Sequence, residues 1–143
     1  MAEAALDEII DRCHRALLSL VNGDASSWAQ LFANRDDVTL GNPFGPFVRG
    51  LDDVMATASA AADRYRDGEI VAVERVATYT GDDLACIAEV ERFRARVGGS
   101  DQMSDVALRV TTTFCREDGA WKVVHRHADP ITTPRSTESV ISS

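Results

Sequence analysis

Residues 119–129 read Gly-Ala-Trp-Lys-Val-Val-His-Arg-His-Ala-Asp, and this stretch decides the fold. It closes a hairpin and places two histidines at strand spacing beside an acid, which is typical of the last strand of a sheet. Three further strands are predicted before it, at 69–80, 84–97 and 106–116, separated by turns rich in Gly and Asp. The second half of the chain is therefore predicted to be an antiparallel meander.

The first half of the chain is predicted to be helical. Apolar residues recur at three- and four-residue steps from Leu6 to Val21, which gives the first helix an apolar stripe. A short second helix carries Trp28, and a third follows Gly50 and stops at Gly68. Helices followed by long strands indicate an α+β domain, whose strands must curve strongly to close over three helices. That curvature encloses a concave pocket.

Length and composition restrict the class of protein. A chain of 143 residues, 45% of them hydrophobic, fits one domain, expected at 1–130, with a flexible tail rich in Ser and Thr at 131–143. The net charge of −8 makes nucleic acid and membrane surfaces poor partners. No apolar run approaches the ~20 residues of a membrane helix, so we expect a cytoplasmic protein. The three widely spaced cysteines are expected to be reduced.

The order of four short motifs resembles that of the NTF2-like superfamily, specifically its SnoaL-like and ketosteroid-isomerase-related branch. The motifs are Asn22-Gly23-Asp24, Leu31-Phe32-Ala33, Asn42-Pro43-Phe44-Gly45 and Arg49-Gly50. The resemblance spans nearly the whole chain. It implies an NTF2-like cone, with three N-terminal helices packed on a mostly antiparallel sheet around a pocket, and dimers formed through the convex sheet face. The fold hosts enzymes, binding modules and assembly domains, so it does not name a reaction.

Two strand segments are also similar to the calmodulin-dependent kinase association domain, another NTF2-like member. The pocket of that domain carries inward arginines, which fall on Glu91, Thr112 and Ala128 of this sequence. All three are replaced, so a pocket that binds carboxylates through arginine is not expected here.

A pair of glutamates gives the strongest carboxylate signal. Glu89, Glu91 and Phe93 share one face of their strand. If this face is concave, desolvation makes Glu91 a candidate general acid or base. The alternative is a structural ion pair in which Arg126 keeps Glu91 ionised.

The turn at 117–119 decides which side chains of the last strand face the pocket, because a one-residue slip reverses every side chain. A two-residue turn would pair Thr112 with His125 and direct His125 and His127 inward. In that register His125 would replace Glu91 as the catalytic candidate.

The alternative is a three-residue loop, Glu117-Asp118-Gly119, whose glycine is left-handed and forms a bulge. This loop would pair Thr112 with Val124 and direct Lys122, Val124 and Arg126 inward. We expect this second register. Trp121 and the two histidines would then line a dimer interface, with Trp121 as its anchor.

Several further residues are candidates for binding a ligand. Asn42 stands where ketosteroid isomerases carry a catalytic aspartate, and since an amide cannot shuttle that proton, Asn42 either orients a substrate or caps its own loop. Tyr65, near the end of the third helix, carries a hydroxyl that needs a partner if buried. The candidate ligand-binding set is Trp28, Asn42, Tyr65, Glu89, Thr112, Phe114 and Arg126.

A metal site is not expected. His125, His127 and Asp129 have two-residue spacing, but a site needs further ligands and His14 is the only other histidine.

We therefore expect a homodimeric, cofactor-free protein that binds a small, mostly apolar organic molecule. If it is an enzyme, the resemblance implies isomerase, lyase or hydrolase chemistry by acid–base residues. The competing class is a non-catalytic assembly domain that oligomerises through its sheet face. A cavity of about 300 Å³ or more would favour the first class.

Overall fold

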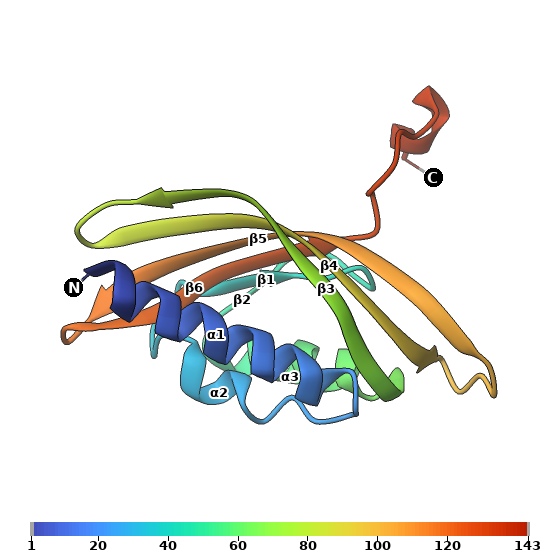
Figure 1. Ribbon diagram of the computed structural model, residues 1–143, viewed down its shortest axis with the longest axis horizontal. Helices are drawn as coiled ribbons and strands as arrows, with labels where there is room; N and C mark the ends of the chain where they lie inside the picture. The colour runs from blue at the N-terminus through green and yellow to red at the C-terminus, as the bar shows by residue number, and fades with distance from the viewer. Residues whose placement is uncertain (1, 143) are drawn as a thin grey trace.

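The computed structural model describes residues 2–142, with side chains from residue 5, and within this range a six-stranded sheet wraps around the helices (Figure 1). The helices are α1 (Ala2–Leu20), α2 (Trp28–Leu31), α3 (Leu51–Ala62) and the 3-10 turn η1 (Thr137–Val140). The strands are β1 (Thr39–Gly41), β2 (Val48–Arg49), β3 (Tyr65–Thr80), β4 (Leu84–Val97), β5 (Met103–Glu117) and β6 (Ala120–Asp129).

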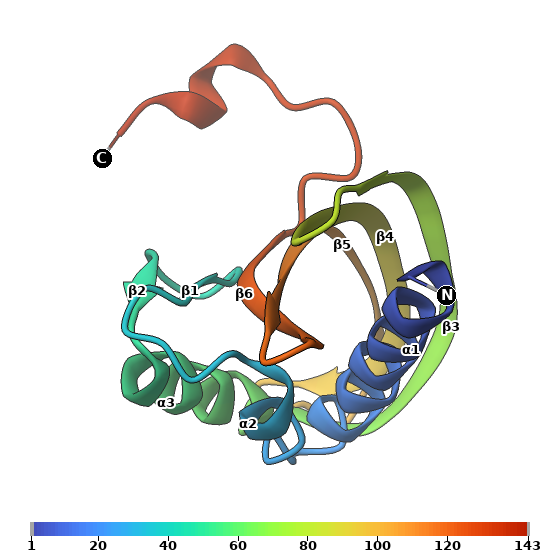
Figure 2. The same ribbon diagram turned by 90° about the vertical axis from the view of Figure 1, so that its left-hand side faces the viewer.

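The sheet has the strand order β2-β1-β6-β5-β4-β3. Strands β3 to β6 form the predicted antiparallel meander, β1 pairs parallel to β6, and β2 pairs antiparallel to β1. Figure 2 shows the sheet bent into an arc, with α1, α2 and α3 on its concave side. The prediction of an α+β cone with a mostly antiparallel sheet is confirmed.

Register shifts bend the sheet. The β3–β4 ladder shifts at three places and the β5–β6 ladder at one. Each bulge adds an unpaired residue to a strand, which increases the local twist and lets a long strand curve over the helices.

The β5–β6 turn differs from the expected three-residue loop. Glu117 pairs with Ala120, so the turn contains only Asp118 and Gly119, whose φ angles are 52° and 82°. Two consecutive positive φ angles are the signature of a type I′ hairpin turn. The expectation was wrong because Asp118, with its short polar side chain, also adopts the left-handed conformation.

A bulge does occur in β6, but it lies inside the strand. Phe114 pairs with Val123, whereas the preceding residue Thr113 pairs with His125, so Val124 is left without an opposite residue. Side chains on the two sides of Val124 therefore follow different alternations.

The bulge explains which side chains of β6 face inward. Before it, Trp121 and Val123 are buried, and after it Arg126 and Ala128 line the interior. Arg126 is inward as expected, but Thr112 pairs with Arg126 and not with Val124 or His125. Trp121 is not on the convex face: it packs in the core, 5% exposed, with the guanidinium carbon of Arg116 4.4 Å from its ring centre.

The third helix is shorter than predicted. It ends at Ala62, and β3 begins at Tyr65, so Gly68 lies within the strand and does not stop a helix. A Cβ on Gly68 would lie 2.4 Å from a methyl carbon of the buried Val21. The glycine is needed because the end of α1 packs directly on the backbone of β3. Asn22 fastens this contact, donating to the carbonyl of Gly68 at 3.0 Å and accepting from its N–H at 3.2 Å.

The C-terminal segment lies outside the interior. Residues 130–142 leave the end of β6 and project away from the sheet, and η1 is exposed (Figure 2). Their flexibility stays a prediction. Cys13, Cys86 and Cys115 are free thiols. In the described range, helices long and apolar enough to cross a bilayer are absent.

Substituting Gly68 tests the packing of α1 on β3. Gly68→Ala is expected to lower the free energy of unfolding by about 1–3 kcal/mol, because the added methyl overlaps Val21 and overpacks the contact. The measurement is urea unfolding followed by circular dichroism. Gly45→Ala is the matched control, since nothing lies within 4 Å of its added Cβ. Equal stability of the two variants would contradict this account of the contact.

Candidate functional site

Polar side chains are buried on the concave face of the sheet. In the described part of the chain these are Glu89, Glu91 and Thr112. Glu89, Glu91 and Phe93 are all buried and alternate along β4 with outward-facing residues, as their spacing predicts. A charged group buried in this way needs a partner.

Glu91 has such a partner in Arg126. The two guanidinium nitrogens Nη1 and Nη2 of Arg126 donate to the two carboxylate oxygens of Glu91 at 3.0 and 2.7 Å. Both side chains are buried, with 2% of Glu91 and 11% of Arg126 exposed. Burial lowers the pKa of Arg126, but the charge and hydrogen bonds of Glu91 outweigh it and raise the pKa above its ordinary value. Arg126 therefore keeps its charge, and both oxygens of Glu91 accept hydrogen bonds from it.

Glu89 is held by two other basic groups. Nε2 of His14 lies 3.0 Å from one carboxylate oxygen, and Nε of Arg75 donates to the other at 2.8 Å. Burial raises the pKa of Glu89, but hydrogen bonds from His14 and Arg75 outweigh it and hold the pKa below its usual value. Glu89 lies on β4 and thus connects this strand both to α1 and to β3.

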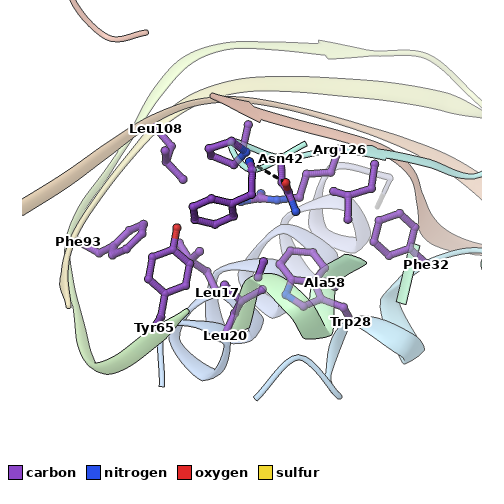
Figure 3. A pocket seen from close by; sticks show the side chains of 15 residues that line it. Leu17, Leu20, Trp28, Phe32, Asn42, Ala58, Tyr65, Phe93, Leu108 and Arg126 are labelled. Carbon is purple, nitrogen blue, oxygen red and sulfur yellow. Dashed lines mark hydrogen bonds between the residues drawn. The ribbon is translucent and has the colours of Figure 1, made fainter. Parts of the chain in front are cut away.

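A cavity lies between the helices and the sheet at the Phe93 end of β4 (Figure 3). Its volume is about 50 Å³, room for a few water molecules and well below the roughly 300 Å³ that would favour a binding protein or enzyme over an assembly domain. The lining residues are Leu17, Leu20, Trp28, Phe32, Leu40, Asn42, Pro43, Phe44, Ala58, Ala61, Tyr65, Phe93, Leu108, Arg126 and Ala128.

The cavity wall is apolar apart from a few groups. Tyr65, 4% exposed, packs edge-on against Phe93 with ring centres 5.4 Å apart. Burial raises the pKa of Tyr65 to about 12, so its hydroxyl keeps its proton at neutral pH. Asn42 accepts the N–H of Phe44 through Oδ1 at 3.0 Å, which is the loop-capping role considered from the sequence. Arg126 is the remaining polar group of the wall. Its partner Glu91 lies behind it and does not line the cavity.

The structure brings together four of the predicted binding residues. Trp28, Asn42, Tyr65 and Arg126 line the cavity, and Glu91 contacts its wall through Arg126.

The others lie elsewhere in the interior. Glu89, Thr112 and Phe114 are buried but do not line the cavity. Glu89 is four residues from Phe93 along β4, which is about 13 Å of strand, so facing alone did not place it at the cavity.

Several residues that line the cavity were not among the predicted binding residues. Phe93 and Ala128 could have been found, because they continue the inward alternation of Glu91 and Arg126. Leu17 and Leu20 belong to the apolar stripe of α1, and Leu108 to the inward face of β5. These patterns predict burial equally well for a residue that lines a cavity and for one that fills the core.

His125 and His127 lie on the convex face, away from the cavity. Nδ1 of His125 is 2.7 Å from Oγ1 of Thr39, and Nε2 of His127 is 3.4 Å from the Asp129 carboxylate. The exposed ring of Phe47 covers both imidazoles, with ring centres 5.9 and 5.7 Å away. Burial lowers the pKa of His125, and the electrostatic effect of the nearby His127 lowers it further. The register that would make His125 a pocket residue is not formed, because the bulge at Val124 turns Arg126 inward instead.

A shared metal site is also not formed by these residues. Groups of three or more His, Cys, Asp or Glu side chains arranged to hold an ion are absent from the described residues.

Comparisons with known proteins agree with this architecture. The sequence model of the SnoaL-like domain family matches residues 7–132. No curated protein is similar enough in sequence to match.

Solved structures of similar fold have low sequence identity to the chain. An NTF2-like superfamily protein from Salmonella enterica serovar Typhimurium has a TM-score of 0.78 and 17% identity, covering 96% of this chain and 99% of its own. A ketosteroid isomerase-like protein from Erwinia carotovora atroseptica has a TM-score of 0.75 and 15% identity, covering 91% and 96%. A candidate calcium/calmodulin-dependent protein kinase type II association domain from Thiobacillus denitrificans has a TM-score of 0.70 and 17% identity, covering 88% and 94%. These similarities establish the fold.

Removing one member of the buried ion pair is expected to destabilise the folded protein. Glu91→Gln is expected to lower the free energy of unfolding by about 3–5 kcal/mol, because it leaves the Arg126 charge buried without a counter-charge. Glu91→Met combined with Arg126→Met should recover most of the loss. Glu74→Gln is the control, since its pair with Arg92 is exposed and contributes less than about 1 kcal/mol. Urea unfolding of the four proteins makes the measurement; a Glu91→Gln protein as stable as wild type would refute the pairing.

Proposed function

Since the chain belongs to the SnoaL-like domain family, we propose that it binds a small, mostly apolar organic molecule in the cavity beside Phe93. One observation carries the proposal: the cavity wall is apolar except for a few polar groups, among them Asn42, Tyr65 and Arg126. This combination is typical of small-molecule sites, where apolar walls supply affinity and a few polar groups fix orientation.

Ligand binding requires the cavity to enlarge. Its volume of about 50 Å³ holds water but not a drug-sized molecule. Phe44 is the lining residue best placed to make room, because it lies between β1 and β2 and is 39% exposed. Its ring is 5.9 Å from that of Tyr65, and the guanidinium carbon of Arg64 is 4.4 Å from its centre. In this proposal the ligand displaces the Phe44 ring from Tyr65.

The ionisable groups favour binding over acid–base catalysis. Among the described residues that line the cavity, none carries a carboxylate, an imidazole or a thiol. Glu91, the nearest carboxylate by its contact with Arg126, has both oxygens occupied. Any proton transfer by Glu91 would begin only after a ligand separates it from Arg126.

Filling the cavity tests this proposal. A panel of uncharged aromatic fragments is titrated by ligand-observed NMR against wild type, Ala58→Leu and Ala60→Leu. Ala58 lines the cavity on α3, so a leucine there should weaken every hit by about tenfold or more, since it occupies the ligand's space. Ala60 is the control, because it lies on the exposed face of the same helix. Hits that bind Ala58→Leu as tightly as wild type, or a panel without hits, would count against the proposal.

A second proposal concerns assembly. We propose that two copies associate through the convex face around Phe47, His125 and His127. Phe47 is 63% exposed and lies over both histidines, and exposed aromatic rings of this kind are typical of interfaces. This role is compatible with binding in the cavity, because the two surfaces are on opposite faces of the sheet.

Loss of the Phe47 ring should weaken such a dimer. Phe47→Ser and His127→Ala are expected to raise the dimer dissociation constant about tenfold or more, as aromatic anchors at interface centres do. Sedimentation velocity over a concentration series measures the effect. Val140→Ser, at an exposed position in the tail, is the control. A wild-type protein that stays monomeric throughout would reject this second proposal.

A further inference from the structure

Two indole N–H groups are buried without a hydrogen-bond partner among the described residues. They belong to Trp28 and Trp121. Such groups are rare in folded proteins, because a donor removed from water loses its hydrogen bond unless another partner replaces it. Trp121 does not line the cavity and is covered by Arg116, whereas Trp28 is part of the cavity wall. Figure 3 shows the indole nitrogen of Trp28 on the side of Leu20.

Tyr65 provides a second donor to the same space. Its side chain is almost completely buried and lines the cavity. Figure 3 shows this hydroxyl pointing into the cavity, toward Leu108. A phenol in an apolar site gains from donating its proton to a bound acceptor.

Asn42 provides a third donor. Its Oδ1 already accepts the N–H of Phe44, which leaves the Nδ2 amide group as the donor of this side chain. An NH₂ group can only donate. Asn42 therefore adds a donor to those of Trp28 and Tyr65.

The side chains around the cavity offer no free charged acceptor, and the acceptors that remain are the neutral oxygens of Tyr65 and Asn42. Glu91 accepts from Arg126 with both oxygens, and the two charges compensate each other. A ligand carboxylate would meet an arginine that is already paired, and burying it would leave a charge without a counter-charge. A ligand ammonium would likewise find no free carboxylate. The balance of charge at the wall therefore favours an uncharged ligand.

We propose that the cavity selects an uncharged molecule with hydrogen-bond-accepting oxygens, such as a ketone, ester or lactone, and that Trp28, Tyr65 and Asn42 donate to those oxygens. This inference rests on the proposed function, since it specifies the ligand of the same cavity. A site with buried N–H donors rejects an analogue that lacks acceptors, because the donors are then left buried and unpaired.

Three probes of similar size and different polarity test the ligand class. Acetophenone carries an acceptor oxygen, ethylbenzene replaces it with hydrogen atoms, and benzoate carries a charge. In titrations by ligand-observed NMR, acetophenone should bind at least about fivefold more tightly than ethylbenzene, the effect of a neutral hydrogen bond. Benzoate should bind at least about tenfold more weakly than acetophenone, because its charge is desolvated without compensation.

A matched pair of tryptophan variants tests the donor assignment. Trp28→Phe removes the N–H at the cavity and should weaken acetophenone about three- to tenfold while leaving ethylbenzene unchanged. Trp121→Phe removes an equally unpaired N–H outside the cavity and should change neither affinity. Tyr65→Phe removes a hydroxyl of the cavity wall, so it provides a second donor deletion if Trp28→Phe fails to fold.

The outcomes separate this inference from the proposed function. Equal binding of acetophenone and ethylbenzene, or tighter binding of benzoate, would overturn the ligand class while leaving a binding cavity. Loss of acetophenone affinity in Trp121→Phe to the same extent as in Trp28→Phe would overturn the donor assignment. Failure of all three probes to bind wild type would overturn both.

Discussion

The buried pair of Glu91 and Arg126 is the interaction on which the interior depends. Two opposite charges meet inside a cone of apolar side chains, where either one alone would be strongly unfavourable. Their bidentate geometry requires that β4 and β6 present these two residues to the same space from opposite sides of β5. The guanidinium also lies over the ring of Trp28, 5.2 Å from its centre, so α2 is placed by the same pair.

The bulge at Val124 makes this pairing possible. Without it, the two-residue turn at Asp118 and Gly119 would place His125 on the inner face and Arg126 on the outer one. One unpaired residue thus exchanges an imidazole for a guanidinium in the pocket wall. The same step places both histidines beneath Phe47 on the convex face, so the two candidate surfaces have their composition fixed by one local irregularity.

Burial patterns could be predicted from the periodicity of the sequence. Features set by the local backbone conformation, such as the position of a bulge, could not. The α1 stripe and the inward face of β4 were correct, because three- to four-residue and two-residue repeats report burial directly. The bulge was placed at Gly119 because glycine is the usual mark of such a feature, whereas Val124 carries no mark. Gly68 was misread for the related reason that a glycine required by tertiary contact with Val21 looks like one that ends a helix. Arg126 was placed correctly on the inner face and its ion pair with Glu91 was foreseen as an alternative, but its partner on β5, Thr112, was not.

The parallel pairing of β1 with β6 sets the order in which the domain can form. Thr39 meets His125 across 86 residues of chain, and Phe32 meets Val123 across a similar separation. Contacts this distant in sequence form late, because a long loop must close before they can contribute. On the ribosome, β6 is made after the other five strands, so β1 has no sheet edge to pair with until β6 has left the exit tunnel. Helices α1 to α3 and the β3–β5 hairpins can assemble earlier, and the cavity wall is complete only once β1 and β6 have paired.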